Sequence, residues 1–335
     1  MMWGVGIIGA GSYGAQHAHA IKELDTAQVV AASRTNHEAL AEFTTAHGGA
    51  GYTDFHDLLQ DDAVDIVMIA TPHHLHTDVT IAAAQAGKHI LLEKPIAHTP
   101  EDCQRIIDAV QAASVKFMVG HVNHFVPAYR VAKQLLESGE MGEVVHGIAT
   151  MQKYWMVDNR RGWHLDRSTG GGVWLTVGIH PLDRMTWLID SPVTAVSAQF
   201  GTRFHNQNAD DTGMIFVRYA NGAAGTVVST GYNTGAPKHL TELTCSKGML
   251  NIDYEAGVSI GRGEVWQTIP ESIPSDDWMH ESIVEEWSQF ITAIESNTRS
   301  PVPADFAMHI MDVVFASEQS SQEKREISVT STWER

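Results

Sequence analysis

A glycine-rich segment near the start of the chain has the spacing of a dinucleotide-binding loop. It reads Gly9-Ala10-Gly11-Ser12-Tyr13-Gly14 and lies between an apolar run and a helical pattern. In such loops the first glycine makes a tight turn, the second lets the backbone approach a pyrophosphate, and the third lets the helix pack against the strand. The pyrophosphate then lies at the positive end of the helix. The segment therefore predicts binding of a nicotinamide dinucleotide.

The end of the second predicted strand bears on which nicotinamide cofactor is used. An NAD site usually has an acidic residue there for the ribose hydroxyls. This chain has Ala32-Ser33-Arg34-Thr35, with no carboxylate in residues 31–36. Arg34 can pair with a 2′-phosphate, and Ser33 and Thr35 can donate hydrogen bonds to it. We therefore favour NADP and keep NAD as a possibility; the alternative is that Arg34 is solvated and stacks on adenine.

Aromatic and basic side chains gather ahead of a second glycine-rich segment: Tyr154, Trp155, Arg160, Arg161, Trp163 and His164. Aromatic faces stack on the apolar faces of sugar rings, and arginine binds hydroxyls or carboxylates. This stretch is expected to line the substrate site, with Tyr154, Arg161 and Trp163 among its contacts. For any one of them the alternative is packing or a solvated loop.

Histidine is abundant, with 19 residues, which raises the question of a metal site. His73, His74 and His76 lie in one segment, but metal sites need supporting ligands at fixed spacing. This part of the chain is also already assigned to the dinucleotide site by the glycine loop, so we predict no metal. We expect His76 to cap its helix or to border the cofactor, and His73 to contact the nicotinamide side.

The overall charge argues against several partners. The chain has 22 Lys and Arg against 40 Asp and Glu, a net charge of −18, which repels nucleic acid and anionic membranes.

Two cysteines, Cys103 and Cys245, cannot form a disulfide framework and favour a reducing compartment. The sequence has no apolar run of membrane-spanning length, and the first strand leaves no room for a signal peptide. We predict a cytoplasmic protein.

Two patterns of elements must position these residues. Strands are predicted over 3–8, 28–32, 64–70, 89–92 and 117–119, alternating with helices over 13–24, 36–47, 76–86 and 100–113. Such alternation is typical of a parallel, doubly wound sheet. Strands are then predicted over 144–152, 193–203, 211–219, 223–232, 239–245 and 249–252, with helices over 127–138, 172–188, 281–295 and 305–318. Long strands joined by turns predict a mostly antiparallel sheet.

The predicted fold is therefore α/β with two domains. Residues 1–122 form a Rossmann dinucleotide-binding domain with a doubly wound parallel sheet. Residues 123–335 form an α+β domain for substrate binding and oligomerisation, and its last helices can pack back on the first domain.

Three segments carry a resemblance to a known family. Thr71-Pro72 ends an apolar strand, Glu93-Lys94-Pro95 ends the next, and residues 170–183 contain a glycine run followed by His180. Together with the glycine loop they resemble the glucose–fructose oxidoreductase, inositol dehydrogenase and rhizopine-catabolism (Gfo/Idh/MocA) family over essentially the whole chain. The resemblance implies a large open sheet in the second domain, homodimers or homotetramers formed through it, and an active site between the domains.

The resemblance also assigns the chemistry. It implies that Lys94 is the catalytic lysine, that Pro95 is a rigid and often cis turn, and that His180 is a general base or orients a hydroxyl. The family usually has Asp four residues before that histidine, but here the residue is Thr176. This implies a substrate with a different hydroxyl pattern, or a mechanism that relies on Lys94 and His180 alone.

These arguments define an expected site and activity. Cofactor contacts are expected from Gly9, Gly11, Ser12, Tyr13, Gly14, Ser33, Arg34, Thr71, Pro72, His73, His76, Glu93 and Lys94. Substrate contacts are expected from Lys94, His121, Asn123, Tyr154, Arg161, Trp163, Thr176 and His180. The expected reaction is NAD(P)-dependent hydride transfer at a ring hydroxyl or ketone of a sugar, glycoside or cyclitol. Glycoside cleavage through transient oxidation with recycled NAD(H), and dehydrogenation of a cyclic dihydrodiol, are the alternatives.

Overall fold

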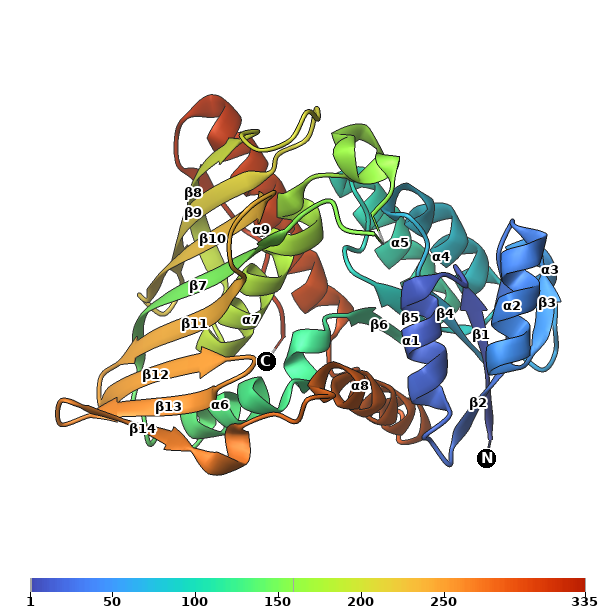
Figure 1. Ribbon diagram of the computed structural model, residues 1–335, viewed down its shortest axis with the longest axis horizontal. Helices are drawn as coiled ribbons and strands as arrows, with labels where there is room; N and C mark the ends of the chain where they lie inside the picture. The colour runs from blue at the N-terminus through green and yellow to red at the C-terminus, as the bar shows by residue number, and fades with distance from the viewer. Residues whose placement is uncertain (1, 159, 335) are drawn as a thin grey trace. The chain divides into compact units, whose positions relative to one another are not determined.

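The computed structural model describes residues 2–158 and 160–334 and divides into two compact units (Figure 1). The first unit comprises Met1–Val122 and Met279–Ala307, and the second comprises Asn123–Trp278 and Met308–Arg335. The chain thus returns to the first unit near its end, through α8 (Trp278–Glu295). That return places residues far apart in sequence within one core.

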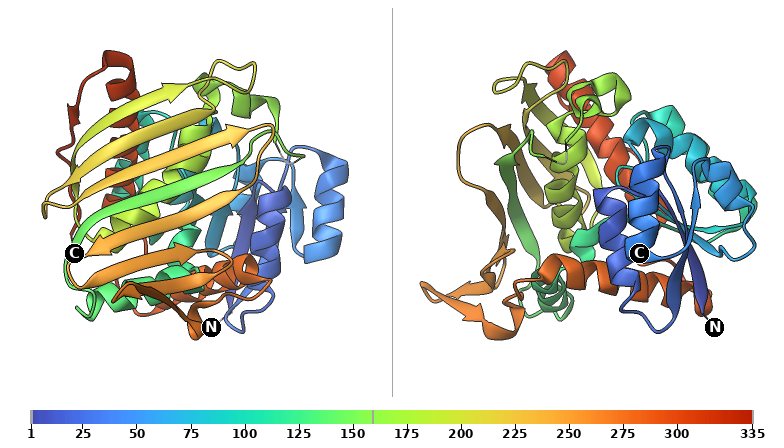
Figure 2. Two further views of the ribbon diagram at one scale, coloured as in Figure 1. Left: turned by 60° about the vertical axis from the view of Figure 1, so that its left-hand side comes forward. Right: turned by 45° about the vertical axis from the view of Figure 1, so that its right-hand side comes forward.

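The first unit is built on a six-stranded parallel sheet in the order β3-β2-β1-β4-β5-β6. Its central strands are almost wholly buried because helices cover both faces (Figure 2), which explains their continuous apolar sequence. The strands are β1 (Trp3–Ile8), β2 (Ala27–Ser33), β3 (Ala50–Tyr52), β4 (Ile66–Ile69), β5 (His89–Glu93) and β6 (Phe117–Gly120). This confirms the predicted doubly wound parallel sheet.

The helices of this unit begin where the sequence provides capping residues. The Asn36 side chain accepts the amide of Ala39 at the start of α2, and Thr99 accepts the amide of Asp102 at the start of α5. The helices are α1 (Ser12–Ile21), α2 (His37–His47), α3 (Phe55–Leu59), α4 (His76–Gln85) and α5 (Pro100–Ala113). Sequence reasoning missed β3 and α3, which are too short to show a hydrophobic period.

The second unit contains a nine-stranded sheet in the order β14-β13-β12-β11-β7-β10-β9-β8-β15. Only the pairing of β7 with β10 is parallel, so the sheet is mostly antiparallel as predicted. The strands are β7 (Val144–Tyr154), β8 (Val193–Gly201), β9 (Thr212–Tyr219), β10 (Ala224–Tyr232), β11 (Lys238–Cys245), β12 (Gly248–Asp253), β13 (Gly257–Arg262), β14 (Val265–Ile269) and β15 (Ile327–Ser328). The last three were missed; β14 is exposed along most of its length and shows no alternation.

One face of this sheet carries α6 (Pro127–Glu137), α7 (Ile179–Ile189) and α9 (Ala304–Glu323) (Figures 1 and 2). The helix α7 lies close to the central strands because Gly147 and Gly225 leave room for Met185. A Cβ added at Gly225 would lie 2.6 Å from the Met185 Cε. The other face of the sheet has no helix of the described chain over it (Figure 2).

The helix predicted over 172–188 is divided in the structure. Gly172 has φ +104° and lies outside it, Trp174–Gly178 form a π-helical turn, and α7 follows. A Cβ at Gly178 would lie 2.4 Å from the Trp174 ring, so the glycine lets that ring pack across the turn. The π turn thus replaces the first part of the helix that periodicity alone predicts.

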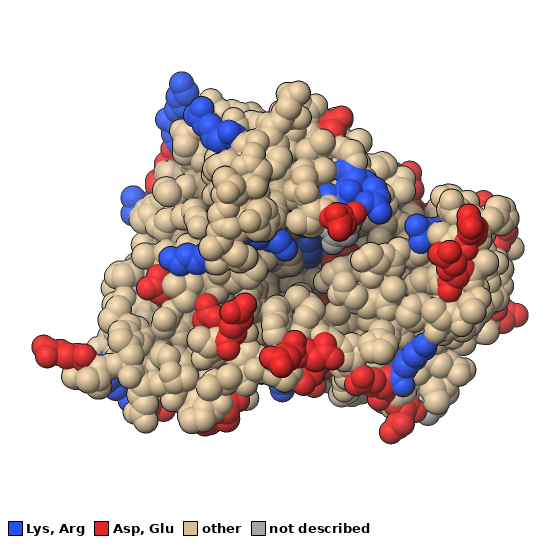
Figure 3. Space-filling model, viewed as in Figure 1, with Lys and Arg blue, Asp and Glu red and all other residues tan. Residues whose placement is uncertain are grey.

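Acidic residues outnumber basic ones, with 40 Asp and Glu against 22 Lys and Arg. Asp and Glu residues are spread over the face shown in Figure 3, as expected for a net charge of −18. Within the described ranges, no helix is both long and apolar enough to span a membrane.

Candidate active site

The glycine loop between β1 and α1 has the geometry that its three glycines predict. Gly9 has φ +95°, and a Cβ there would lie 2.6 Å from the backbone of Ala70. A Cβ at Gly14 would lie 2.6 Å from the carbonyl oxygen of Gly9. At Gly11 the nearest atom would be 4.0 Å away, so the space in front of this residue is open. Gly9 and Gly14 serve the fold, while Gly11 leaves room for a ligand.

The start of α1 has the donors that a pyrophosphate needs. Gly11 is its N-terminal cap and has no side chain, so no capping side chain lies between the start of the helix and a ligand. The loop itself is held by the carbonyl oxygen of Ser33, which accepts the amides of Gly9 and Ala10 at 3.1 Å each. The residues present therefore fit a dinucleotide.

Arg34 lies directly beside this loop. Its side chain is exposed, and its Nη1 donates to the carbonyl oxygen of Ala10 at 3.0 Å. Ser33 is buried and contributes through its backbone, while the Asn36 side chain is occupied in capping α2. Arg34 is thus the basic group at the end of β2 that can meet a phosphate.

Lys94 follows β5 and is half-buried, and the peptide bond to Pro95 is cis. The preceding Glu93 is buried and lies 3.2 Å from the Nε2 of His17. The indole of Trp287 donates to the Nδ1 of His17 at 3.0 Å. Since an indole can only donate, His17 carries its proton on Nε2 and donates it to Glu93.

A second buried acid lies near Glu93. Burial, with the charge of Glu93, raises the pKa of Glu286 well above its ordinary value. The surroundings of Glu286 thus favour its protonated form. Trp287 and Glu286 come from α8, about 190 positions further along the chain. Sequence reasoning missed both, since no local motif marks them.

His76 has a different place from the one predicted. It has no exposed surface; its Nδ1 lies 2.8 Å from the Pro95 carbonyl oxygen and its Nε2 2.9 Å from that of Thr71. It neither caps α4 nor has surface to offer a ligand, so its ring instead joins the two loops. Burial lowers the pKa of His76, opposed by the two carbonyls and Glu93. His73 is 5 % exposed and meets the His76 ring edge-on.

In the second unit, a hydrogen-bonded chain leads to His180 at the start of α7. The Asn123 Nδ2 lies 3.2 Å from the His180 Nδ1, and the Tyr254 hydroxyl donates to the Asn123 Oδ1. The Nη1 of Arg184 donates to the Tyr254 hydroxyl at 2.7 Å. Asn123 was predicted from sequence; Tyr254 and Arg184 were missed, because Tyr254 lies 131 residues away from Asn123.

Thr176 lies one turn before His180, within the π turn, and is 4 % exposed. Asp183 does not take the place of the missing acid. It is fully buried, and its Oδ1 lies 2.9 Å from the Nε2 of His124, whose ring stacks on Trp187. This acid therefore belongs to the packing of α7.

The aromatic and basic side chains before the second glycine-rich segment make contacts within the second unit. Tyr154 is 45 % exposed and meets Tyr232 edge-on, and Trp163 stacks on His164. Arg161 folds onto its own loop, because its Nη1 donates to the carbonyl oxygens of residues 158 and 160. His121, also predicted, is 1 % exposed and belongs to the first unit.

Two further side chains, which were not singled out from the sequence, lie on the inner face of the sheet. Lys153 and His239 share the face of Gly147, which packs against α7, as the strand register shows. The guanidinium of Arg160 lies 4.9 Å from the centre of the Trp155 ring. Burial, with the charge of Arg160, lowers the pKa of Lys153, and burial lowers that of Arg160 to about 10.

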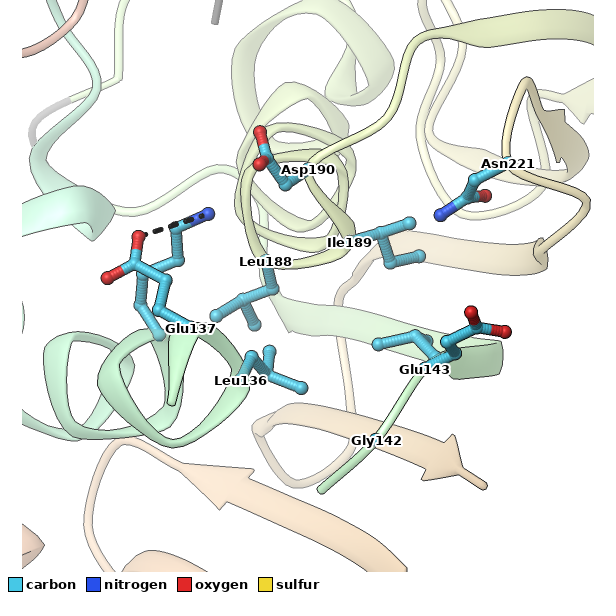
Figure 4. Close-up of a pocket in the computed structure, with 10 residues that line it drawn as sticks. Leu136, Glu137, Gly142, Glu143, Leu188, Ile189, Asp190 and Asn221 are labelled. Atoms are coloured by element: carbon cyan, nitrogen blue, oxygen red, sulfur yellow. Dashed lines mark ion pairs between the residues drawn. The ribbon is translucent and has the colours of Figure 1, made fainter. Parts of the chain in front are cut away.

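A surface depression of about 270 Å³ lies elsewhere in the second unit (Figure 4). It is lined by the ends of α6 and α7 and the start of β7, including Leu136, Glu143, Leu188 and Asn221. None of the predicted site residues lines it. It is therefore not the candidate site.

The described residues include one group with the side chains of a metal site, formed by His19, Glu23 and His280. The Nε2 of His280 lies 2.7 Å from a Glu23 oxygen, and the two histidine rings lie 4.5 Å apart. His19 and Glu23 are exposed, and the contacts are those of a surface ion pair, so the group is no basis for assigning a metal.

Comparison with known proteins agrees with this geometry. Residues 3–121 match an oxidoreductase family described as an NAD-binding Rossmann fold, and residues 129–251 match the GFO/IDH/MocA C-terminal domain. The levoglucosan dehydrogenase of Pseudarthrobacter phenanthrenivorans is 30 % identical over 288 residues, which cover 75 % of this chain and 73 % of the relative. The chain belongs to the Gfo/Idh/MocA family. It is accordingly an NAD(P)-dependent oxidoreductase.

Two further relatives of this Gfo/Idh/MocA protein bear on its fold and chemistry. A dehydrogenase of 1-carboxy-3-chloro-3,4-dihydroxycyclohexa-1,5-diene from Comamonas testosteroni is 32 % identical over 206 residues, 61 % of this chain and 52 % of the relative. The structure of a levoglucosan dehydrogenase complex with NADH and levoglucosan has a TM-score of 0.91 at 24 % identity. That match covers 98 % of this chain and all of the other, and it confirms the fold.

Proposed function

We propose that this protein is an NADP-linked dehydrogenase or reductase acting on a ring hydroxyl or ketone of a sugar or cyclitol. Arg34 beside the glycine loop is the observation that supports NADP, because a guanidinium suits a 2′-phosphate and NAD has none. In this proposal the first unit binds the dinucleotide and the second recognises the substrate. When bound, the nicotinamide supplies the hydride acceptor or donor.

The protein's own residues manage the proton in this proposal. Lys94 takes the proton from the substrate hydroxyl in oxidation and returns it in reduction, and His180 contacts the reacting oxygen. The test is turnover of purified protein with NADP⁺ and a panel of sugars and cyclitols. Lys94→Met is expected to reduce kcat at least about 100-fold while dinucleotide binding remains. Lys238→Met, at an exposed site, is the control. Equal activity of Lys94→Met and wild type would contradict this role.

Thr176, which stands where the family usually has Asp, is expected to affect which substrates the protein prefers. A threonine can only exchange hydrogen bonds, whereas an acid at this position would add a charge one turn from His180. Thr176→Asp is expected to change the order of preference across the substrate panel. If activity and substrate range stay the same, Thr176 has no part in selection.

Two alternative reactions share the same residues. Glycoside cleavage by transient oxidation would release product with no net change in nicotinamide absorbance. Oxidation of a cyclic dihydrodiol would yield a catechol together with reduced cofactor. Product analysis beside the absorbance measurement separates the three reactions.

The unpaired cations favour a substrate that carries a carboxylate. Lys153 and Arg160 are partly buried, and neither pairs with an acid among the residues that the structure describes. The Arg160 Nε is buried without a hydrogen-bond partner there. Buried cations without a counter-ion are costly, and an anionic ligand would offset that cost. The Comamonas relative is named for a carboxylated ring diol, which fits this class.

The substrate class is tested with pairs of acids and their neutral analogues, such as a uronic acid with its parent sugar. Wild type is expected to have a lower KM for the acid of each pair. Lys153→Met and Arg160→Met are expected to raise the KM for the acids about 10-fold or more and to leave that for the neutral analogues unchanged. Equal effects on both members of a pair would show a structural role instead.

The uncovered sheet face favours a homo-oligomer. Ile148, Met214, Phe216 and Met249 lie on one face by the strand register, and each is 38–53 % exposed. Apolar side chains gathered on an open sheet face are typical of subunit interfaces. We infer that a second copy of the chain covers this face.

A further inference from the structure

His180 is held by a hydrogen-bond chain whose direction is fixed at its far end. That end is Arg184, which is fully buried. Its Nε donates to the Thr241 hydroxyl at 3.0 Å, its Nη2 to the Thr150 carbonyl oxygen at 2.7 Å, and its Nη1 to the Tyr254 hydroxyl at 2.7 Å. A guanidinium can only donate, so the Tyr254 oxygen must accept from it.

The hydrogen-bond direction at Tyr254 in turn determines the orientation of the Asn123 amide. Because the Tyr254 oxygen accepts from Arg184, its own proton points to the Asn123 Oδ1. The Tyr254 ring is held in place by stacking on Trp278 at 4.8 Å, with 8° between the planes, and by the His239 ring edge-on at 5.3 Å. The Asn123 amide therefore presents its oxygen to Tyr254 and its NH₂ group to the other side.

The NH₂ group of Asn123 faces the Nδ1 of His180 at 3.2 Å. An amide NH₂ can only donate, so the His180 Nδ1 accepts and carries no proton. A neutral imidazole has one protonated nitrogen, which must then be Nε2. If the Asn123 amide were rotated by 180°, its NH₂ group would face the Tyr254 oxygen, which already accepts from Arg184. The Tyr254 hydroxyl proton would then no longer have Asn123 as its acceptor.

We propose that Arg184, Tyr254 and Asn123 are positioning residues that fix His180 as the Nε2–H tautomer, so that it donates a hydrogen bond to the reacting oxygen and does not act as the base. This rests on the proposed function for the identity of that oxygen. In oxidation the substrate proton goes to Lys94, while the His180 Nε2–H stabilises the negative charge that develops on the oxygen. In reduction the same N–H polarises the carbonyl, and Lys94 returns the proton.

The tautomer itself can be measured without substrate. Nitrogen-15 NMR of the protein labelled at histidine distinguishes a protonated from an unprotonated ring nitrogen, and His180→Gln assigns the signal. Wild type is expected to have a protonated Nε2 and a bare Nδ1 at neutral pH. Asn123→Asp replaces the donor by an acceptor and is expected to move the proton to Nδ1. Tyr129→Phe is the matched control: it removes a hydroxyl that contacts Thr241 in the same buried cluster, but not the chain to His180.

Kinetics provide the second measurement. Asn123→Asp is expected to lower kcat about 10- to 100-fold with little change in KM for the dinucleotide, and to add an ionisation to the pH profile of kcat. Tyr254→Phe is expected to give a smaller loss, because the amide can then rotate. A protonated Nδ1 in wild type, or an unchanged tautomer in Asn123→Asp, would overturn the proposal. Absence of turnover with every substrate would contradict the proposed function alone, since the NMR result does not depend on it.

Discussion

The proposed preference for NADP depends on Arg34. Its guanidinium is exposed and lies beside the glycine loop through its bond to the Ala10 carbonyl oxygen. Substitution of Arg34 by Ala removes a charge-assisted contact to a 2′-phosphate, so the KM for NADP⁺ is expected to rise about 10- to 100-fold. The KM for NAD⁺ is expected to change less than about threefold. Steady-state kinetics with both cofactors measure this.

The effect of Arg34→Ala on the KM for NAD⁺ is the control for its effect on the KM for NADP⁺. A loss of the same size with NAD⁺ would show that Arg34 holds the loop or the adenine instead of a phosphate. Arg105→Ala, at an exposed site on α5, should leave both KM values unchanged.

At the residue scale, short motifs single out the residues proposed to bind the cofactor and to react, but not the residues that contact them. The glycine loop, Lys94 and His180 were singled out because each lies in a short motif. Tyr254 and Trp287 reach their partners, Asn123 and His17, across 131 and 270 positions, and no local pattern encodes such a pairing. His76 was expected to cap its helix or to border the cofactor, but the fold buries it completely.

Two glycines at the start of α1 are expected to have different roles, Gly11 in ligand binding and Gly14 in the packing of the fold. Gly11 has φ −106° and ψ −160°, which alanine tolerates, and a Cβ there would meet nothing closer than 4.0 Å. Gly11→Ala is therefore expected to keep the wild-type melting temperature and to weaken dinucleotide binding at least about tenfold, because the new methyl group occupies the approach of the pyrophosphate. Calorimetric titration with NADP⁺ and a thermal melt measure the two effects.

Gly14→Ala provides the contrast, since its Cβ would lie 2.6 Å from the Gly9 oxygen. It is expected to lower the melting temperature as well as the binding. A Gly11→Ala protein that binds NADP⁺ as tightly as wild type would contradict the assignment of this loop to the pyrophosphate.

The contact of α9 with β8 predicts a sensitivity to acid. His309 is fully buried, its Nε2 accepts the amide of Val193 at 3.0 Å, and burial lowers its pKa from 6.5 to about 4. The folded state thus favours the neutral ring, and stability is lost as the pH falls through 6.5 towards about 4. The loss amounts to about 3 kcal/mol in the free energy of unfolding. Urea unfolding at pH 7 and pH 4.5 measures it.

His309→Gln keeps an acceptor for the Val193 amide but does not titrate. The fall in stability between the two pH values is expected to be smaller in this variant than in wild type. If the free energy of unfolding falls by the same amount in both proteins, the acid sensitivity does not arise from His309.

At the element scale, the sequence predicts elements with a clear hydrophobic period. Apart from the short β3 and α3, the parallel sheet and its helices were predicted to within a few residues, because buried strands are continuously apolar. The π turn at Trp174–Gly178 could not be predicted, since it depends on the packing of the Trp174 ring over Gly178. The strand β14 lacks the alternation of a half-buried strand, because it lies exposed at the edge of the sheet.

At the scale of the whole molecule, the open sheet face predicts self-association. Phe216→Glu places a charge on the face that also carries Ile148, Met214 and Met249, and burial of that charge in an interface would cost several kcal/mol. The variant is expected to be a monomer in analytical ultracentrifugation at concentrations where wild type is a dimer or tetramer. Leu75→Glu, at an exposed site in the first unit, is the control. A monomeric wild type would contradict this interface.

The proposed activity couples the reduction of NADP⁺ to the oxidation of a ring hydroxyl. The most direct measurement is the near-ultraviolet absorbance of reduced nicotinamide when the purified protein is given NADP⁺ or NAD⁺ with paired acidic and neutral sugars and cyclitols. We predict net reduction with at least one member of the panel, a higher kcat/KM with NADP⁺ than with NAD⁺, and no reduction by Lys94→Met. Reduction of NAD⁺ alone would contradict the role given to Arg34, and full activity of Lys94→Met would contradict the proposed chemistry.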